Sequence, residues 1–151
     1  MTLMEQFHSM SSDEKRRVHF ELCEQALAIW SHYIEDKKKI KYTDSVVGLQ
    51  HLVDLTLPLD AFFGAQQNRD GDDTAKRYLE PITSMQDDDL VFPDHIKFAY
   101  YAIYNLFCKY AMKEQIDDWT IVNQALSAHS DLTQIDSLLL VAMKSASNQI
   151  V

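Results

Sequence analysis

The first strongly periodic segment of the chain begins at Ser11. Ser11 and Glu14 have the spacing of a capping box, in which each side chain accepts a hydrogen bond from the other residue's backbone amide. Apolar residues then recur at steps of three and four, the period of an α-helix, at Val18, Leu22, Ala26, Ile29 and Tyr33. Three lysines at residues 37–39 suit the negative end of a helix dipole. The pattern predicts one long helix that ends in these lysines.

A second helix is expected before Pro58, capped by Thr43 or Ser45. The apolar residues that would line one face of it are Val46, Leu49, Val53 and Leu57. Pro58 should break or kink this helix, because proline has no amide proton and a fixed φ. Residues 64–71 are then expected to form a polar loop.

A shorter helix is expected to begin at Asp72 or Asp73, because acidic side chains favour the positive end of a helix. It should run through Tyr78 and be interrupted at Pro81. An acidic loop at residues 87–89 follows.

The most apolar segment, residues 96–112, follows a Pro-Asp pair at residues 93–94. A helix that is apolar on most of its faces is usually the central helix of a bundle. Two more helices are expected, one opened by Asp117 or Asp118 and the last by Ser-Asp at residues 130–131. Together these patterns predict an all-α fold: a single helical domain over residues 1–151, built as an orthogonal bundle of about six helices.

Composition agrees with this fold class. The chain has 46% hydrophobic residues, enough for one core, and only 3 Gly and 3 Pro, too few for the turns of many short strands. No stretch approaches the roughly 18 uncharged apolar residues of a membrane span, and the first residues lack the pattern of a secretory signal. Cys23 and Cys108 lie within apolar helical patterns, as buried reduced thiols do. We therefore expect a soluble, cytoplasmic protein.

The negative charge is concentrated in the middle of the chain. Residues 42–96 hold three Lys/Arg against eleven Asp/Glu, a net charge of −8 out of −9 for the whole chain. Such a surface repels the phosphates of nucleic acid and attracts a basic protein. The sequence thus predicts a protein partner, with neither nucleic acid nor membrane as the target.

Two pairs of residues could contribute to a metal site, but neither is complete. His51 and Asp54, three apart on the expected second helix, could act as ligands or as an acid–base pair, yet two ligands do not make a site. His19 and Cys23 lack the further ligands that zinc requires. We therefore expect no metal and no cofactor.

Catalytic motifs are missing as well. There is no G-x-S-x-G elbow and no glycine-rich phosphate loop. The acidic segment at residues 68–73 departs from a calcium-binding loop where Asp73 replaces the glycine and Leu79 replaces the glutamate. The chain is not predicted to be an enzyme.

A tyrosine-rich stripe on residues 96–112 has two interpretations. It could line a ligand pocket, although such stripes more often belong to a core. Buried tyrosine hydroxyls need partners, so some are expected near the surface. The residues of the stripe are Tyr100, Tyr101, Tyr104, Phe107 and Tyr110.

The acidic middle third is the strongest candidate binding surface. Phe62, Phe63, Tyr78 and Phe92 are expected to act there as aromatic anchors. The predicted partner-binding residues are Asp70, Asp72, Asp73, Tyr78, Asp87, Asp88, Asp89, Phe92 and Asp94.

Five stretches carry a resemblance to a known family: YTDSVVGLQHLVD (42–54), YLEPI (78–82), FPD (92–94), YYAIYN (100–105) and DDW (117–119). In size, acidity and helical pattern they resemble the small acidic helical immunity proteins of bacterial polymorphic and type VI secreted toxins. The resemblance implies a protein that binds the catalytic domain of a toxin encoded beside it. It carries over no catalytic residue.

The sequence therefore predicts an immunity protein that neutralises a cognate cytoplasm-acting toxin by covering a basic catalytic face. One alternative is a helical small-molecule- or metal-binding protein, with a Tyr-rich pocket and the His51/Asp54 pair at its mouth. Another is a homo-oligomeric structural module in which the aromatic stripe forms the subunit interface.

Overall fold

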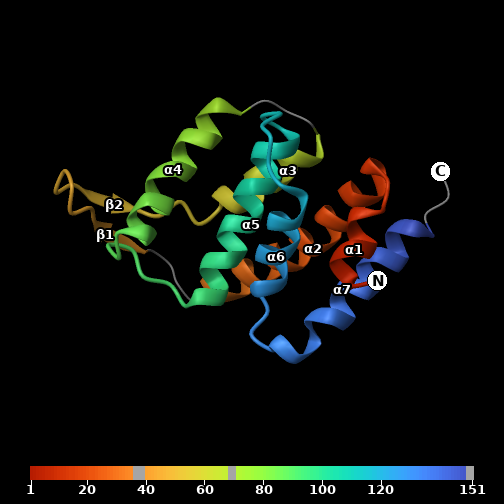
Figure 1. Ribbon diagram of the computed structural model, residues 1–151. Helices are drawn as coiled ribbons and strands as arrows, with labels where there is room; N and C mark the ends of the chain where they lie inside the picture. Colours follow the sequence, from red (N-terminus) through yellow and green to blue (C-terminus); the bar gives the residue numbers. More distant parts are fainter. Residues whose placement is uncertain (36–39, 68–70, 149–151) are drawn as a thin grey trace.

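The structure is a computed structural model that describes residues 1–35, 40–67 and 71–148. The described residues form seven α-helices, one 3-10 helix and a small β-hairpin (Figure 1), so the predicted all-α class is confirmed. In chain order the elements are α1 (Leu3–His8), α2 (Ser12–Ile34), β1 (Lys41–Thr43), β2 (Gln50–Leu52), α3 (Leu57–Gln66), α4 (Asp72–Gln86), α5 (Asp94–Tyr110), α6 (Asp118–Ser127), η1 (Leu132–Gln134) and α7 (Ile135–Ser147).

Helix α2 begins as its sequence predicts. The Ser11 hydroxyl accepts a hydrogen bond from the Glu14 amide at 3.2 Å, and the Glu14 carboxylate accepts one from the Ser11 amide at 2.9 Å. The lysines expected to end this helix lie outside the described residues. Helix α1 was not predicted; Thr2 caps it, and fully buried Phe7 attaches it to the core.

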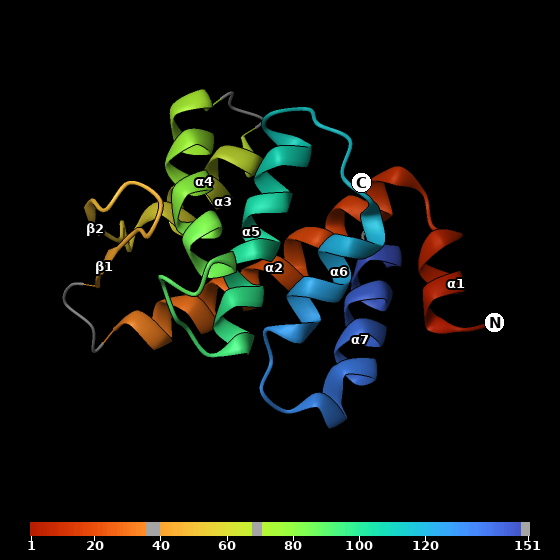
Figure 2. The same ribbon diagram turned by 60° about the vertical axis from the view of Figure 1, so that its left-hand side comes forward.

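Helix α5 is the centre of the bundle, as its apolar pattern predicts. It packs against α2, α3, α4 and α6, while α7 covers α2 and α6. The buried residues form one continuous cluster that includes Trp30, Ile103 and Leu106. In Figures 1 and 2, α4 and the hairpin occupy one end of the molecule, and α1 and α7 occupy the other. No helix in the described ranges is long and apolar enough to cross a lipid bilayer.

The prediction of a helix before Pro58 is wrong. Residues 41–52 form an antiparallel hairpin in which Tyr42 pairs with His51. The Asp44 carboxylate accepts a hydrogen bond from the Val47 amide at 2.6 Å, and Gly48 adopts φ +78°, a turn conformation that glycine favours. These local turn contacts outweigh the three- and four-residue spacing of the apolar positions.

The two prolines near this region also behave differently from expectation. Pro58 lies in the first turn of α3, where its missing amide costs nothing, so it starts a helix rather than breaking one. Pro81 lies inside α4, which continues to Gln86. An internal proline costs a helix about 3 kcal/mol, and we attribute the survival of α4 to the burial of Tyr78, Pro81 and Met85 on its inner face.

Candidate binding groove

An exposed apolar patch lies where the hairpin meets α4. Val46 is 79% exposed, Val47 69% and Leu49 57% at the hairpin turn, and Leu79 on α4 is 51% exposed. Single exposed apolar residues are ordinary, but several that line one hollow mark a surface that can bind a partner.

A groove runs between these two elements. The residues that line it are Asp44, Val46, Val47, Leu49, His51, Lys76, Leu79, Glu80, Thr83, Ser84, Asp87 and Asp89. Its apolar side chains come from the hairpin turn and from Leu79, and four of its polar side chains are carboxylates. The groove therefore combines an apolar surface with an acidic border.

Asp89 joins the two sides of the groove. Its carboxylate accepts hydrogen bonds from the Ser45 amide at 2.7 Å and from the Ser45 hydroxyl at 2.9 Å. Asp88, in the same loop, has φ +60°, a conformation that aspartate tolerates better than most residues. Asp87 and Asp88 are exposed, so their charges remain available to a partner.

Three ionisable side chains meet on the polar side of the groove. His51 Nε2 lies 2.7 Å from Asp44 Oδ2 and 3.7 Å from Glu80 Oε1. The backbone amide of Val47, and after it the His51 side chain, lower the pKa of Asp44 below its usual value. The three ligand atoms lie within 4.8 Å of one another, so this cluster is the set of described residues best placed to hold a cation.

The pairing of His51 with Asp54, which a helix would have allowed, is not formed, because this segment is a hairpin. Asp54 instead accepts a hydrogen bond from Arg77 Nη1 at 2.7 Å. Asp44 and Glu80, the actual neighbours of His51, lie seven positions before it and 29 after it in the sequence. Only the hairpin pairing and the packing of α4 bring them together.

The predicted partner-binding aspartates do not form one face. Asp72 and Asp73 lie in the first turn of α4, whereas residues 87–89 follow its last turn. A helix of 15 residues is about 22 Å long, so the two groups are well separated. Asp73 also pairs with Arg77 at 3.2 Å.

A further predicted aspartate, Asp94, stands apart from the groove. Asp94 is exposed in the first turn of α5, 4.0 Å from Lys97. Asp70 lies outside the described residues. Of the predicted aspartates that the structure describes, Asp87 and Asp89 line the groove, and Asp88 lies between them in the chain.

The prediction that Tyr78 and Phe92 are aromatic anchors at the surface is wrong, because both are buried. Tyr78 is 0% exposed, and its ring packs at a tilt of 46° against that of Tyr100, with 4.4 Å between ring centroids. Phe92 is 4% exposed and packs edge-on against Trp30. Phe62 is buried too, and Phe63 alone of the four is exposed. The aliphatic residues of the hairpin turn take the place that the aromatic residues were expected to fill.

The tyrosine-rich stripe belongs mostly to the core. Tyr100 and Phe107 are buried, and Tyr101, Tyr104 and Tyr110 are half-buried. Burial raises the pKa of Tyr100 and of Tyr104 above the usual tyrosine value. These residues do not face the groove.

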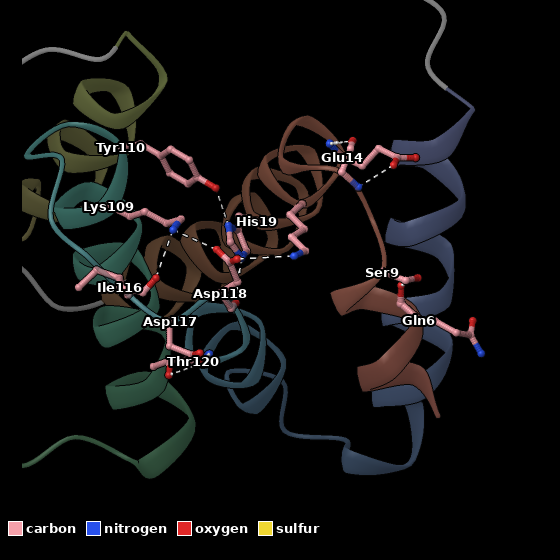
Figure 3. Close-up of polar contacts among 12 residues, drawn as sticks. Gln6, Ser9, Glu14, His19, Lys109, Tyr110, Ile116, Asp117, Asp118 and Thr120 are labelled. Atoms are coloured by element: carbon pink, nitrogen blue, oxygen red, sulfur yellow. Dashed lines mark hydrogen bonds and ion pairs between the residues drawn. The ribbon is translucent and has the colours of Figure 1, made fainter. Parts of the chain in front are cut away.

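A second polar cluster lies away from the groove, where α2, α5 and α6 meet, and its contacts hold these helices together (Figure 3). His19 is fully buried, and its ring nitrogens lie 2.7 Å from the Tyr110 hydroxyl and 2.8 Å from the Asp118 carbonyl oxygen. The Asp118 carboxylate pairs with Lys109 at 3.0 Å. Because both ring nitrogens of His19 are engaged, the residue has no free position for zinc.

The thiol of Cys23 contacts a backbone carbonyl group and not another zinc ligand. Its thiol lies 3.8 Å from the Ala102 carbonyl oxygen, and burial raises its pKa well above the usual value. Cys23 and Cys108 are both buried free thiols, as their sequence positions predict. The pairing of His19 with Cys23 in a zinc site is therefore not supported by the geometry.

Comparison of the chain with protein-family models, with curated proteins and with solved structures finds no match.

Proposed function

We propose that this chain is a binding protein that docks a basic partner protein in the groove between the hairpin and α4. In this proposal it is a bacterial immunity protein: it acts in the cytoplasm, binds a cognate toxin and covers the toxin's catalytic face. It works by binding and not by catalysis.

The observation that carries the proposal is the exposed apolar patch of the hairpin turn beside the aspartates that follow α4. Val46, Val47 and Leu49 offer burial to a partner. Asp87 and Asp88 are exposed and offer negative charge at the border. An apolar centre with a charged rim is the usual anatomy of a protein interface.

The acidic border of the groove favours a cationic protein as the partner. Lysine and arginine side chains that grip an anionic substrate in a toxin would pair with the border aspartates. The apolar turn would exclude water beside them and so strengthen these pairs. A nucleic acid would meet like charge on the same surface, which disfavours it.

The proposed face is smaller than the acidic segment of the sequence. It consists of the hairpin turn, Leu79 and residues 87–89, and leaves Asp72, Asp73 and Asp94 outside the main contact. Steering by the whole negative segment would still accelerate encounter with a basic partner.

The first test uses the chain together with the product of the adjacent reading frame. Val47→Asp should weaken their complex by at least about 10-fold in Kd, because a charge would enter the apolar centre of the interface. Val141→Asp is the matched control, because Val141 is 61% exposed on α7, far from the hairpin. Equal affinity for the two variants in isothermal titration calorimetry would contradict the proposed groove.

The second test isolates the border charges. The double variant Asp87→Asn, Asp88→Asn should slow association several-fold at low salt and change dissociation less. The double variant Asp13→Asn, Asp136→Asn removes the same charge from exposed positions elsewhere. If both doubles slow association equally, net charge and not the groove steers the partner.

Self-association is the competing use of this patch. Light scattering of the purified chain should give a monomer mass. A dimer that Val47→Asp dissociates would replace the proposed partner with a second copy of this chain. The version of the small-molecule alternative that relies on a Tyr-rich pocket is not favoured, because Tyr100 and Phe107 are core residues.

A further inference from the structure

The strongest unassigned constellation in the described residues is the carboxylate–imidazole cluster of Asp44, His51 and Glu80. Asp44 opens the hairpin turn, His51 lies on β2 and Glu80 lies on α4. One oxygen from each carboxylate and one imidazole nitrogen lie within 4.8 Å of one another. We propose that these three side chains form a binding site for a divalent transition-metal ion, with Zn²⁺ as the best-suited ion.

Each ligand is oriented by a neighbour that is not itself a ligand. The Val47 amide donates to Asp44 Oδ1 at 2.6 Å, which leaves Oδ2 facing His51. The Ser84 hydroxyl donates to Glu80 Oε1 at 2.6 Å, and Ser84 is itself only 2% exposed. Outer partners of this kind fix ligand geometry at metal sites and are a large part of their affinity.

The imidazole is held as well. The ring of Tyr42 stacks on that of His51 at 5.3 Å between centroids, with 24° between their planes. Tyr42 is buried, so it gives the histidine a rigid support. An ion would replace the proton between His51 Nε2 and Asp44 Oδ2, now 2.7 Å apart, and release it to solvent. The two atoms would move apart to coordinate the ion.

The site is closed on one side and open on the other. Asp44 is 8% exposed, while the side chains of His51 and Glu80 are 29% and 38% exposed and line the groove. An ion can therefore enter from the groove, and water can complete its coordination. Three protein ligands with a remaining water position are a common zinc arrangement.

The donor set decides which ions are suited. Imidazole nitrogen favours Zn²⁺ and its transition-metal neighbours, whereas Mg²⁺ and Ca²⁺ prefer sites made of oxygen alone. A bound ion would connect the hairpin to α4 and hold the groove in one shape. This inference stands independently of the proposed partner, since its test needs only the purified chain.

The first experiment is a calorimetric titration of the chelator-treated full chain with ZnCl₂. We expect one site, and a His51→Gln variant whose affinity is at least about 10-fold lower; Ser84→Ala should also lose roughly 10- to 100-fold. His32→Gln is the matched control, because His32 and Glu35 form an exposed pair at 3.5 Å that belongs to no three-ligand group among the described residues. Equal affinity of His51→Gln and the natural chain overturns the site, as does the absence of binding to the natural chain at millimolar Zn²⁺.

A second measurement does not depend on the variants folding. Co²⁺, which replaces Zn²⁺ in such sites, should shift and broaden amide NMR signals of the natural chain most strongly around residues 44, 51 and 80. Mg²⁺ at the same concentration should leave these signals unchanged. Broadening centred on any other part of the chain would overturn the proposal.

Discussion

The imidazole of His19 on α2 and the hydroxyl of Tyr110 at the end of α5 are joined by a 2.7 Å hydrogen bond. The Asp118 carbonyl oxygen, 2.8 Å from Nε2, can only accept, so Nε2 carries the ring proton. Burial lowers the pKa of His19 to about 4, so the ring is neutral at pH 7 and Nδ1 accepts from the Tyr110 hydroxyl. Protonation of this buried ring at lower pH makes the α2–α5–α6 junction sensitive to pH.

Stability should fall as the pH falls below about 6.5. Burial lowers the pKa of His19 to about 4 from an ordinary value of 6.5, so the unfolded chain binds a proton in this window that the folded chain refuses. Full stability is therefore present above pH 6.5 and is lost progressively towards pH 4. Urea unfolding should give a free energy about 2 kcal/mol lower at pH 5 than at pH 7.

The control for this dependence is His19→Gln. It should be less stable at pH 7 but should lose less between pH 7 and pH 5, because glutamine does not titrate there. Burial also lowers the pKa of half-buried His129, so a weaker dependence in the same direction should remain. An unchanged slope in the variant would contradict the assignment to His19.

Tyr110→Phe should destabilise the fold. The change removes the donor to His19 Nδ1 and leaves a buried acceptor without its partner, which costs about 1–3 kcal/mol. Chemical denaturation at pH 7 measures the loss. Stability equal to that of the natural chain would contradict the hydrogen bond.

Tyr78→Phe should have the opposite outcome. The Tyr78 hydroxyl is buried and has no hydrogen-bond partner among the described residues. Removing it eliminates an unpaired polar group while the ring keeps its contact with Tyr100, so stability should be unchanged or higher by about 1 kcal/mol. The same denaturation experiment, run beside Tyr110→Phe, checks the sign; a loss as large as that of Tyr110→Phe would contradict it.

Gly48→Ala should loosen the hairpin turn. Gly48 has φ +78°, where an alanine side chain costs about 1 kcal/mol, and no atom lies close enough to clash with the added methyl group. Hydrogen exchange of the Asp44 amide, which donates to the Leu49 carbonyl at 3.0 Å, should become roughly 5-fold faster. Gly48→Asn should show a smaller effect, because asparagine tolerates positive φ better than alanine does.

The helices with strong local signals could be predicted from the sequence. The capping box of Ser11 and Glu14, the helix start at Asp117 and the apolar circumference of α5 all appear in the structure. Each depends on residues within a few positions of one another. Such signals are readable because capping and helical periodicity are local properties.

The groove could not be predicted in the same way. Residues 43–57 have apolar spacing that fits a helix, and only the turn contacts of Asp44 and Gly48 favour the hairpin. The helical spacing places Val46 and Leu49 on one apolar face, whereas both are exposed at the hairpin turn. A change from helix to hairpin moves every side chain in the segment to a new neighbour.

The chain's own sequence determined the all-α class, the central position of α5 and the concentration of negative charge in residues 42–96. These follow from period and composition, which need no knowledge of distant contacts. Tertiary structure alone decided that the aspartates separate to the two ends of α4, and that Tyr78 and Phe92 enter the core. It alone placed His51 beside Asp44 and Glu80, because side chains far apart in sequence become neighbours only when packing and strand pairing bring their backbones together.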